Sequence, residues 1–216
     1  MTTIDNKDIS KATLNRLPSY LKYLYQLDKL NVATVSSTTI ANGLNLNPVQ
    51  VRKDIALVSS VAGKPKMGYV TKEIIADLEG FLGYNNTHDA ILVGVGGLGK
   101  AFLGYGGFEN YGLNIVAAFD NNEKLVNTKI NGKPVYDVSK LQSIVARFNI
   151  QIGIITVPSY AAQEVADRMV AAGIKAIWNF ASVHLNIPSD VALKNEDLAS
   201  SLALLSLQIQ SNRKDG

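Results

Sequence analysis

The chain has 216 residues, of which 47% are hydrophobic and 18% are charged, proportions typical of a globular protein with an ample core. It contains no cysteine and only two histidines, which excludes disulfides and thiolate metal sites and nearly excludes a multi-histidine metal site. The first residues lack the apolar core of a signal peptide, and no apolar run approaches the roughly 20 residues that cross a bilayer. We therefore expect a cytoplasmic protein without a metal site.

The net charge of +3 is unevenly distributed along the chain. Residues 1–80 carry ten Lys or Arg against seven Asp or Glu, whereas residues 81–216 carry eleven of each kind. Within residues 47–72, five basic residues accompany one acidic residue, Asp54. A positive patch beside a neutral remainder indicates an anionic partner for the first segment, with an ordinary solvated face as the alternative.

Two helices are predicted at the start of the chain. Leucines recur at helical spacing over residues 10–28, which indicates an amphipathic helix. Pro18 either begins the main helix or kinks a longer one. A short helix is expected next, with Ser36 or Ser37 as its N-cap and Gly43 closing it in the left-handed conformation.

A third helix is predicted to follow closely. Asn47 and Pro48 supply its N-cap and first position. Its side chains divide into an apolar face with Val51, Ile55 and Val58 and a polar face with Gln50, Lys53 and Asp54, flanked by Arg52. Two short helices joined by a tight turn, the second basic on its outer face, form a helix-turn-helix pattern.

The next segment has the composition of a wing. Residues 62–69 combine turn residues with Lys64 and Lys66, and residues 69–71 favour a strand. Gln and Arg suit base edges, whereas Lys more often contacts the DNA backbone. We therefore predict DNA contacts from five side chains: Gln50, Arg52, Lys53, Lys64 and Lys66. The alternative is a helical cap domain with incidental charges. Residues 78–87 contain two glycines and two asparagines and are predicted to link two domains.

A glycine-rich turn organises the second half of the chain. An apolar run over residues 90–93 opens directly into Gly94-Val95-Gly96-Gly97-Leu98-Gly99, and residues 100–103 read as the start of a helix. In a dinucleotide-binding turn, the first glycine of the Gly-x-Gly-x-x-Gly pattern makes the tight turn. The second lets the backbone approach the pyrophosphate, and the third lets helix and strand pack closely. Phosphate then lies on the N–H groups of the helix N-terminus, so these six residues are predicted to bind the cofactor.

From residue 89 onward, predicted strands alternate with predicted helices. The further strands are expected at residues 113–119, 133–136, 150–157 and 174–180, and the helices at 137–149, 159–172 and 196–210. This alternation predicts an α/β fold with a parallel sheet covered on both faces. Asp120 ends the second strand, 21 residues after Gly99, where an acidic side chain accepts hydrogen bonds from ribose hydroxyls. No arginine follows nearby to meet a 2′-phosphate, which favours NAD(H) over NADP(H).

The sequence offers little for catalysis. Tyr136 and Lys140 match the Tyr-x-x-x-Lys spacing of short-chain dehydrogenases, but they follow the third strand directly and read as a strand end and a helix start. His88 precedes the first strand, and His184 follows a strand end with no obvious carboxylate partner. The nucleophile elbow and the P-loop are both missing from the sequence. We therefore predict no catalytic residues and a chain that binds a dinucleotide without using it.

The last helix is apolar on more than one face. It carries Leu198, Leu202, Leu204, Leu205, Leu207 and Ile209. Leaving such side chains in water costs roughly 1.5–3 kcal/mol each. The helix is therefore expected to pack on its own chain or on a partner subunit, and two-fold dimers also suit palindromic DNA sites.

The order and length of these parts resemble the Rex family of redox-sensing transcriptional repressors. The resemblance covers essentially the whole chain and is carried by residues 15–20, 50–54, 68–69, 94–102, 118–120, 157–158, 161–167, 179–180 and 197–198. It implies a homodimer that binds an inverted-repeat DNA operator when NAD+ predominates and releases it when NADH rises. It also implies that the final helix is exchanged between subunits.

The resemblance further assigns individual residues. Val157, Pro158, Phe180 and Tyr105 are expected to contact the cofactor. Arg16, Tyr105 and Asp197 stand where the family is thought to link the nicotinamide site to the DNA-binding domain. The chain departs from the family pattern in the wing and at His184, where arginine is common.

The predicted organisation is a winged helix-turn-helix domain at residues 1–80, a Rossmann-type NAD(H)-binding domain at 81–195 and a C-terminal, domain-swapped helix at 196–216. Two other functions stay open at this point. One is an NAD(P)-dependent oxidoreductase, against which the missing acid–base residues count. The other is a nucleotide-binding subunit related to the CoA-binding domains of acyl-CoA synthetases, against which the basic helix-turn-helix counts.

Overall fold

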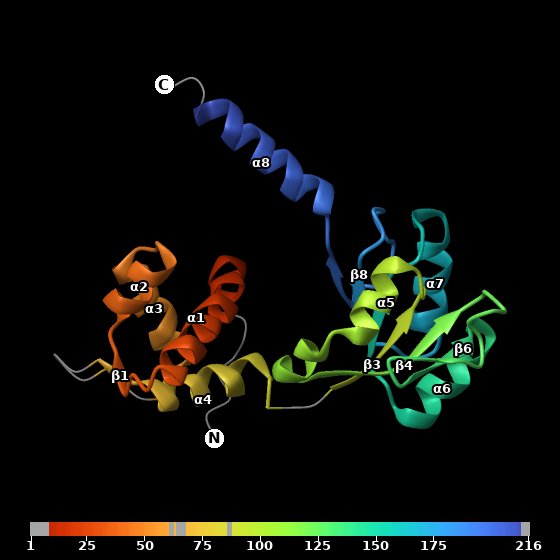
Figure 1. Cartoon of the computed structure of the whole chain (residues 1–216), viewed down its shortest axis with the longest axis horizontal. Helices are drawn as coiled ribbons and strands as arrows, with labels where there is room; N and C mark the ends of the chain where they lie inside the picture. The colour runs from red at the N-terminus through yellow and green to blue at the C-terminus, as the bar shows by residue number, and fades with distance from the viewer. Residues whose placement is uncertain (1–8, 61–62, 64–67, 86–87, 213–216) are drawn as a thin grey trace. The chain divides into compact units, whose positions relative to one another are not determined.

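The computed structural model describes residues 9–60, 63, 68–85 and 88–212 (Figure 1). The chain divides into two compact units, Met1–Asn86 and Thr87–Gly216, drawn from red to yellow and from green to blue. The predicted wing residues Lys64 and Lys66 lie outside the described residues.

The first unit consists of helices and a two-stranded sheet. Its helices are α1 (Lys11–Lys29), α2 (Ser37–Leu44), α3 (Pro48–Val58) and α4 (Thr71–Leu82), and its strands are β1 (Thr34–Val35) and β2 (Tyr69–Val70). The strands pair antiparallel, as expected for the base of a wing. One apolar cluster joins all four helices, and Leu17, Tyr20 and Leu24 of α1 are fully buried in it.

Most of the helix starts and caps predicted for the first unit are present in the structure. Pro18 lies inside α1 rather than at its start. Ser36 caps α2, and the side chain of Asn47 caps α3 with Pro48 in the first turn. Gly43 does not close α2 as predicted, because the helix runs on to Leu44 and Asn45 adopts the left-handed conformation at φ 54°.

Two other predictions in this unit were wrong. Residues 78–82 do not form a linker, because α4 continues through them, with Leu78 fully buried, and ends at Gly83 with φ 75°. The first compact unit accordingly extends beyond residue 80, to Asn86. Asp54 does not belong to the exposed face of α3, because its side chain is only 1% exposed and faces α1.

The second unit is built on a seven-stranded sheet. The strands lie in the order β5-β6-β4-β3-β7-β8-β9, and all neighbours pair parallel except β5 and β6. Their bounds are β3 (His88–Val93), β4 (Leu113–Asp120), β5 (Lys129–Ile130), β6 (Lys133–Asp137), β7 (Ile152–Ile155), β8 (Ala176–Asn179) and β9 (Ala192–Asn195). Sequence reasoning missed the two short edge strands, β5 and β9.

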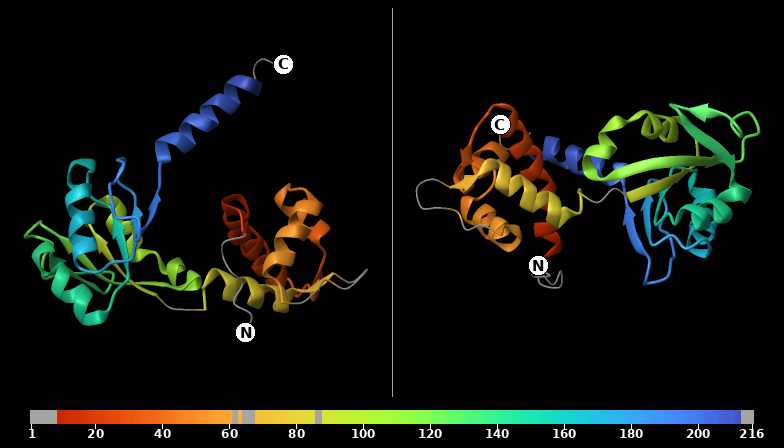
Figure 2. Two further views of the ribbon diagram at one scale, coloured as in Figure 1. Left: turned by 180° about the vertical axis from the view of Figure 1, so that it is seen from behind. Right: turned by 90° about the horizontal axis from the view of Figure 1, so that it is seen from below.

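Helices cover both faces of this sheet (Figures 1 and 2). They are α5 (Gly97–Gly104), the 3-10 helices η2 (Gly106–Tyr111) and η3 (Val138–Lys140), α6 (Leu141–Phe148) and α7 (Ser159–Ala171). A last helix, α8 (Leu198–Asn212), follows β9. Along β3, Ala90 and Leu92 pack in the cluster of α5, whereas Ile91 and Val93 pack in the cluster of α6 and α7. This two-residue alternation explains why β3 reads as a continuous apolar run.

The C-terminal helix α8 does not lie on the sheet of its own unit (Figure 2). The side chains of Leu202, Leu204, Leu205, Leu207 and Ile209 are 57–64% exposed. Packing on its own sheet, one of the two arrangements expected for this helix, is therefore not observed. Within the described part of the chain, every helix is too short or too polar to cross a membrane.

Candidate dinucleotide and nucleic-acid sites

The glycine turn joins β3 to α5 as the sequence predicted. Gly94 adopts φ +101°, and a Cβ there would stand 2.7 Å from the Cγ1 of Val157. At Gly99, a Cβ would overlap the carbonyl oxygen of Gly94, so this position requires glycine for the close packing of helix on strand. An added Cβ at Gly96 or Gly97 would meet no described atom within 4 Å, so the turn presents open backbone there.

Thr156 fixes this turn from the neighbouring strand. Its hydroxyl donates hydrogen bonds to the carbonyl oxygens of Gly94 at 2.7 Å and Val93 at 3.2 Å. Its backbone N–H donates to Val93 at 2.9 Å. Sequence reasoning missed this residue, although its place between a buried strand and Pro158 was the available signal.

Asp120 ends β4 and holds the other side of the turn. Its Oδ2 accepts a hydrogen bond from the N–H of Val95 at 2.7 Å, and its Oδ1 accepts one from the N–H of Asn122 at 2.8 Å. A carboxylate has about four acceptor positions, so two remain for the hydroxyls of a ribose. The side chain thus fits the role that the sequence assigned to it.

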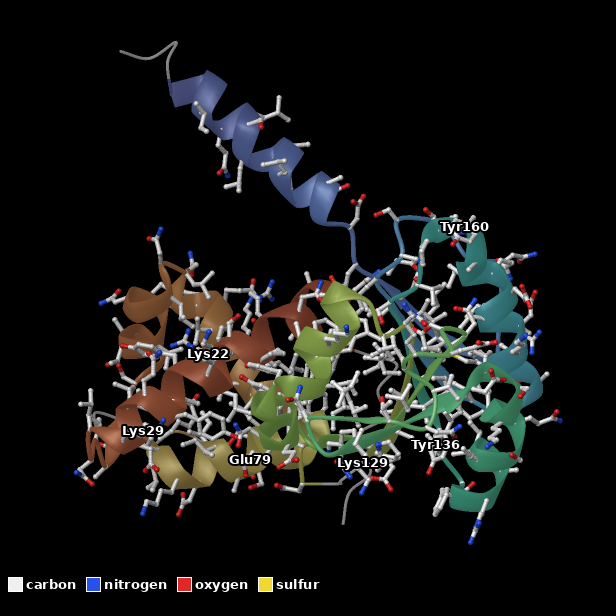
Figure 3. The ribbon with its side chains drawn as sticks, turned by 45° about the vertical axis from the view of Figure 1, so that its right-hand side comes forward. Lys22, Lys29, Glu79, Lys129, Tyr136 and Tyr160 are labelled. Atoms are coloured by element: carbon white, nitrogen blue, oxygen red, sulfur yellow. The ribbon has the colours of Figure 1, made fainter. Side chains whose placement is uncertain are left out.

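A pocket of about 550 Å³ opens at the carboxyl ends of the central strands. It lies where the chain order reverses between β3 and β7, the switch point at which parallel α/β sheets bind ligands. Five of the predicted cofactor residues line it: Gly94, Gly96, Asp120, Val157 and Pro158. A further set was not predicted and comes from the β6 end and from α7: Asp137, Val138, Ser139, Tyr160, Ala161, Glu164, Val165 and Arg168. Figure 3 labels Tyr160, which is 90% exposed near the start of α7.

The charges around this pocket are mainly negative. Asp120, Asp137 and Glu164 contribute carboxylates, and Arg168 contributes a cation. No arginine follows Asp120 closely in the sequence, as noted above, but α7 brings Arg168 to the pocket from a distant part of the chain. Arg168 pairs with Glu164 at 2.8 Å, however, and a hydrogen bond from the Ser139 hydroxyl lowers the pKa of Asp137. Three carboxylates against one paired cation suit ribose hydroxyls better than an additional phosphate.

The remaining predicted cofactor residues lie outside this pocket. Val95 is buried beneath the turn, and Leu98 is 40% exposed on α5. Phe180 belongs to an aromatic cluster, with its ring centroid 4.7 Å from those of both Phe102 and Trp178. Tyr105 is 55% exposed, and its ring packs edge-on against Phe108 at 4.9 Å.

The residues that match the dehydrogenase spacing, and His184, lie in the following surroundings. The ring of Tyr136, also labelled in Figure 3, lies 5.9 Å from that of Phe119 at the end of β6. Lys140 follows in the short helix η3. His184 borders a separate hollow of about 470 Å³ that Asp197 also lines. These positions agree with the reading of Tyr136 and Lys140 as a strand end and a helix start.

The outer face of α3 carries the predicted DNA-reading side chains. Gln50, Arg52 and Lys53 are all exposed. Gln50 and Lys53 also line a hollow of about 420 Å³ together with Arg16 of α1. An exposed amide between two basic groups, on the second helix of a helix-turn-helix, is suited to the edge of a base flanked by phosphates.

Behind this face, the buried carboxylate of Asp54 forms an ion pair with Arg16, whose side chain is partly exposed. The Nε of Arg16 donates to Oδ2 of Asp54 at 2.7 Å, and its Nη2 donates to Oδ1 at 3.0 Å. Burial opposes the charge on Asp54, but hydrogen bonds from Arg16, Tyr20 and Gln50 outweigh it and lower the pKa of Asp54. Burial, together with the hydrogen bond to Asp54, raises the pKa of Tyr20 to about 12, so its hydroxyl stays a donor.

The other end of the predicted relay also has local partners. Asp197 accepts hydrogen bonds from the N–H groups of Ala199 at 3.0 Å and Ser200 at 3.1 Å, which caps the start of α8. A further hydrogen bond from the Ser200 hydroxyl lowers the pKa of Asp197. Arg16 and Asp197 belong to different units, and each is bound within its own.

Comparison with known proteins assigns both units. A family model described as "Putative DNA-binding protein N-terminus" matches residues 8–56, and one described as "CoA binding domain" matches residues 85–183. The redox-sensing transcriptional repressor Rex of Treponema denticola is 40% identical over 201 residues, which cover 93% of this chain and 95% of the relative. The protein of the same name from Porphyromonas gingivalis is 42% identical over 208 residues, which cover 96% and 94%. The chain belongs to the Rex family.

Solved structures of a Rex-family repressor named RSP agree with this assignment. RSP in complex with β-NAD+ and operator DNA matches with a TM-score of 0.89 and 37% identity over 95% of this chain and 94% of RSP. RSP in complex with β-NADH matches with a TM-score of 0.86 and 36% identity over 95% and 96%. The predicted fold, an N-terminal DNA-binding domain followed by a Rossmann-type domain, is thereby confirmed for the Rex family member described here.

Proposed function

We propose that this chain is a DNA-binding transcriptional repressor that senses the NADH/NAD+ ratio. It binds an inverted-repeat operator with NAD+ and releases it with NADH. The observation that carries this proposal is the likeness, over 95% of the chain, to one repressor solved both with NAD+ on operator DNA and with NADH. The glycine turn, Asp120 and the open pocket at the sheet switch point support the ligand, and the exposed polar face of α3 supports the DNA.

The proposed ligand contacts follow from the geometry. Gly96 and Gly97 offer open backbone to the pyrophosphate at the start of α5, and Asp120 has acceptor positions for the adenosine ribose. Val157 and Pro158 form the wall beneath the β7 end. Val95, Leu98 and Gly99 shape the turn rather than the pocket surface. NAD(H) supplies the redox state that is read, and we assign no catalytic residue to this chain.

The proposed DNA contacts are Gln50, Arg52 and Lys53 from α3, with Lys64 and Lys66 of the wing. Two-fold DNA sites require two such helices, so we propose a homodimer. The exposed leucines of α8 support an interface with a second copy, in which this helix is exchanged between subunits. Membrane attachment plays no part in this proposal, and the repressor acts on DNA in the cytoplasm.

We propose that Arg16, Tyr105 and Asp197 connect the nicotinamide to the DNA-binding domain. The ion pair of Arg16 with Asp54 and the capping bonds of Asp197 are the contacts that such a relay would exchange or share. Tyr105 and Phe180 do not line the pocket at the sheet switch point but belong to the aromatic cluster next to α5. We propose that they contact the nicotinamide end of the ligand there. A ligand shifts such an equilibrium only through its different affinities for the two states.

The decisive experiment is a gel shift on an inverted-repeat site that the protein itself selects from a random DNA library. Binding in NAD+ and release by NADH are expected, whereas coenzyme A at the same concentration should leave the complex intact. Arg16→Ala, Tyr105→Phe and Asp197→Ala should each weaken release by NADH. Wild-type release by all three variants would contradict the relay, and release by coenzyme A would contradict redox sensing.

A further inference from the structure

Asp54 is the hydrogen-bonding centre of the helix-turn-helix. It lies on α3 but is only 1% exposed. Its two oxygens accept five hydrogen bonds, from the Thr13 hydroxyl, Nε and Nη2 of Arg16, the Tyr20 hydroxyl and Nε2 of Gln50. Four of these donors come from α1 and hold the carboxylate in place. The fifth comes from the exposed face of α3.

The bond to Gln50 determines which way its amide points. Nε2 of Gln50 donates to Oδ1 of Asp54 at 2.8 Å, one helical turn away. An ionised carboxylate only accepts hydrogen bonds, so the amide must turn its NH2 group, and not its oxygen, toward Asp54. This orientation therefore follows from the chemistry of the pair as well as from the 2.8 Å contact. The other N–H and the oxygen of Gln50 are left for a partner outside the helix.

We propose that Asp54 is a positioning residue for base recognition, which fixes the Gln50 amide so that one N–H and the acceptor oxygen meet the base edge in one order. This inference rests on the proposed DNA-binding function. Gln50 is exposed on the hollow that it shares with Arg16 and Lys53, so a base can reach it. An amide that rotates can pair with either a hydrogen-bond donor or an acceptor at the same place on the base edge. An amide held in one orientation pairs with only one of the two.

The anchoring by α1 is what gives Asp54 this role. A carboxylate free to swing away from Gln50 would leave the amide without this acceptor, and both orientations of the amide would then be populated. Asp54 cannot do so, because Arg16 holds both of its oxygens and Tyr20 donates to Oδ2 at 2.7 Å. The reading side chain is therefore ordered before DNA arrives, which lowers the entropy lost on binding.

The orientation can be tested in the wild-type dimer without any folding risk. In a two-dimensional NMR spectrum of side-chain amides, the pair of Gln50 signals is identified by its loss in Gln50→Met. One of its two protons is expected to be shifted downfield and protected from exchange, as for an N–H bound to a carboxylate. Two protons with the chemical shifts and exchange rates of an ordinary exposed glutamine amide would overturn the inference.

The consequence for recognition is tested with DNA. Each base pair of the selected half-site is substituted in turn, and the affinities are measured for wild type, Asp54→Asn, Gln50→Met and the double variant. Asparagine turns its own NH2 or its oxygen toward Gln50, so Asp54→Asn should reduce discrimination at the base pair facing Gln50 by about tenfold. In the Gln50→Met background the same change should leave the profile unaltered. Asp77→Asn is the matched control, because it makes the same change at a carboxylate of α4 that accepts hydrogen bonds from Ser59 and Ser60 and none from Gln50.

The outcomes separate the two proposals. An unaltered base profile for folded Asp54→Asn, or an equal change in the Gln50→Met background, would overturn the positioning role and leave the repressor function intact. A wild-type protein that selects no DNA site at all would overturn both. If Asp54→Asn does not fold, the NMR measurement on the wild type decides the orientation.

Discussion

Replacing Leu202 and Leu205 of α8 by serine should dissociate the proposed dimer. These side chains are 64% and 57% exposed within one chain and lie one turn apart on the helix. Fully burying a leucine contributes roughly 1.5–3 kcal/mol, so covering the exposed portion of each contributes about 1–2 kcal/mol. Two leucines on each of two subunits then contribute about 4–8 kcal/mol, which corresponds to a dissociation constant raised by about 10³-fold or more.

The assay is sedimentation equilibrium over a range of protein concentrations, followed by operator binding. The double variant Leu202→Ser/Leu205→Ser should be monomeric where the wild type is dimeric, and its operator affinity should fall with it. Ala203→Ser is the matched control, since it places the same residue on the same exposed helix without removing apolar area of this size. A variant that remains as tightly dimeric as this control would refute the assignment of α8 to the subunit interface.

Three further predictions concern the turn and the ion pair. Asp120→Ala should weaken NADH binding by about 10–100-fold in a fluorescence titration, because charge-assisted hydrogen bonds to the ligand are lost. Asp89→Ala, at the opposite end of the sheet, is the control, and an equal NADH affinity of the two variants would contradict this prediction. Gly99→Ala should lower the melting temperature because its Cβ overlaps the Gly94 carbonyl oxygen. Gly96→Ala should melt like the wild type but bind NADH more weakly, because its Cβ meets no protein atom but stands where the ligand would lie. Equal melting temperatures of the two variants would contradict this interpretation. Because the pKa of Asp54 is lowered from 3.8 in the folded chain, its stabilising contribution is present above about pH 4 and is lost as the pH falls through the folded value. The protection factors of amides in α1 and α3, which compare the observed exchange rate with the intrinsic rate at each pH, should therefore fall more between pH 5 and 3 in the wild type than in Asp54→Asn. A parallel fall in both proteins would exclude this linkage.

The features that the sequence predicted well are those in which local chemistry and tertiary packing agree. The glycine turn is one case, because the Gly94 conformation and the Gly99 contact are each met by glycine alone. Asn47 and Pro48 are another, since a cap and a fixed φ act within one turn of chain. Such signals depend on neighbours in sequence, which are visible before the fold is known.

The features that were missed depend on contacts between distant segments. Asp54 was placed on the exposed face because a charged residue in a helix is usually solvated, and only the approach of Arg16, 38 residues earlier, makes its burial favourable. Asp137 reaches the pocket because parallel strands bring their carboxyl ends to one edge of the sheet, and Arg168 reaches it from α7, which packs on that sheet. The edge strands β5 and β9 are short and only partly buried, so they lack the long apolar run that marks β3.

The hydrogen bond from Val95 to Asp120 has a consequence for what the protein measures. It shapes the turn before any ligand arrives, and the oxidised and reduced dinucleotides present the same pyrophosphate and ribose to it. The turn therefore contributes equally to the binding of both forms and cannot favour either conformation of the repressor. When the total concentration of NAD+ and NADH in the cell saturates the binding site, the two forms compete for it. The fraction of sites that holds NADH then follows the NADH/NAD+ ratio rather than the concentration of either form. Because the turn binds both forms equally, the response of the repressor does not depend on the total dinucleotide concentration. The oxidised and reduced forms are distinguished only at the nicotinamide end.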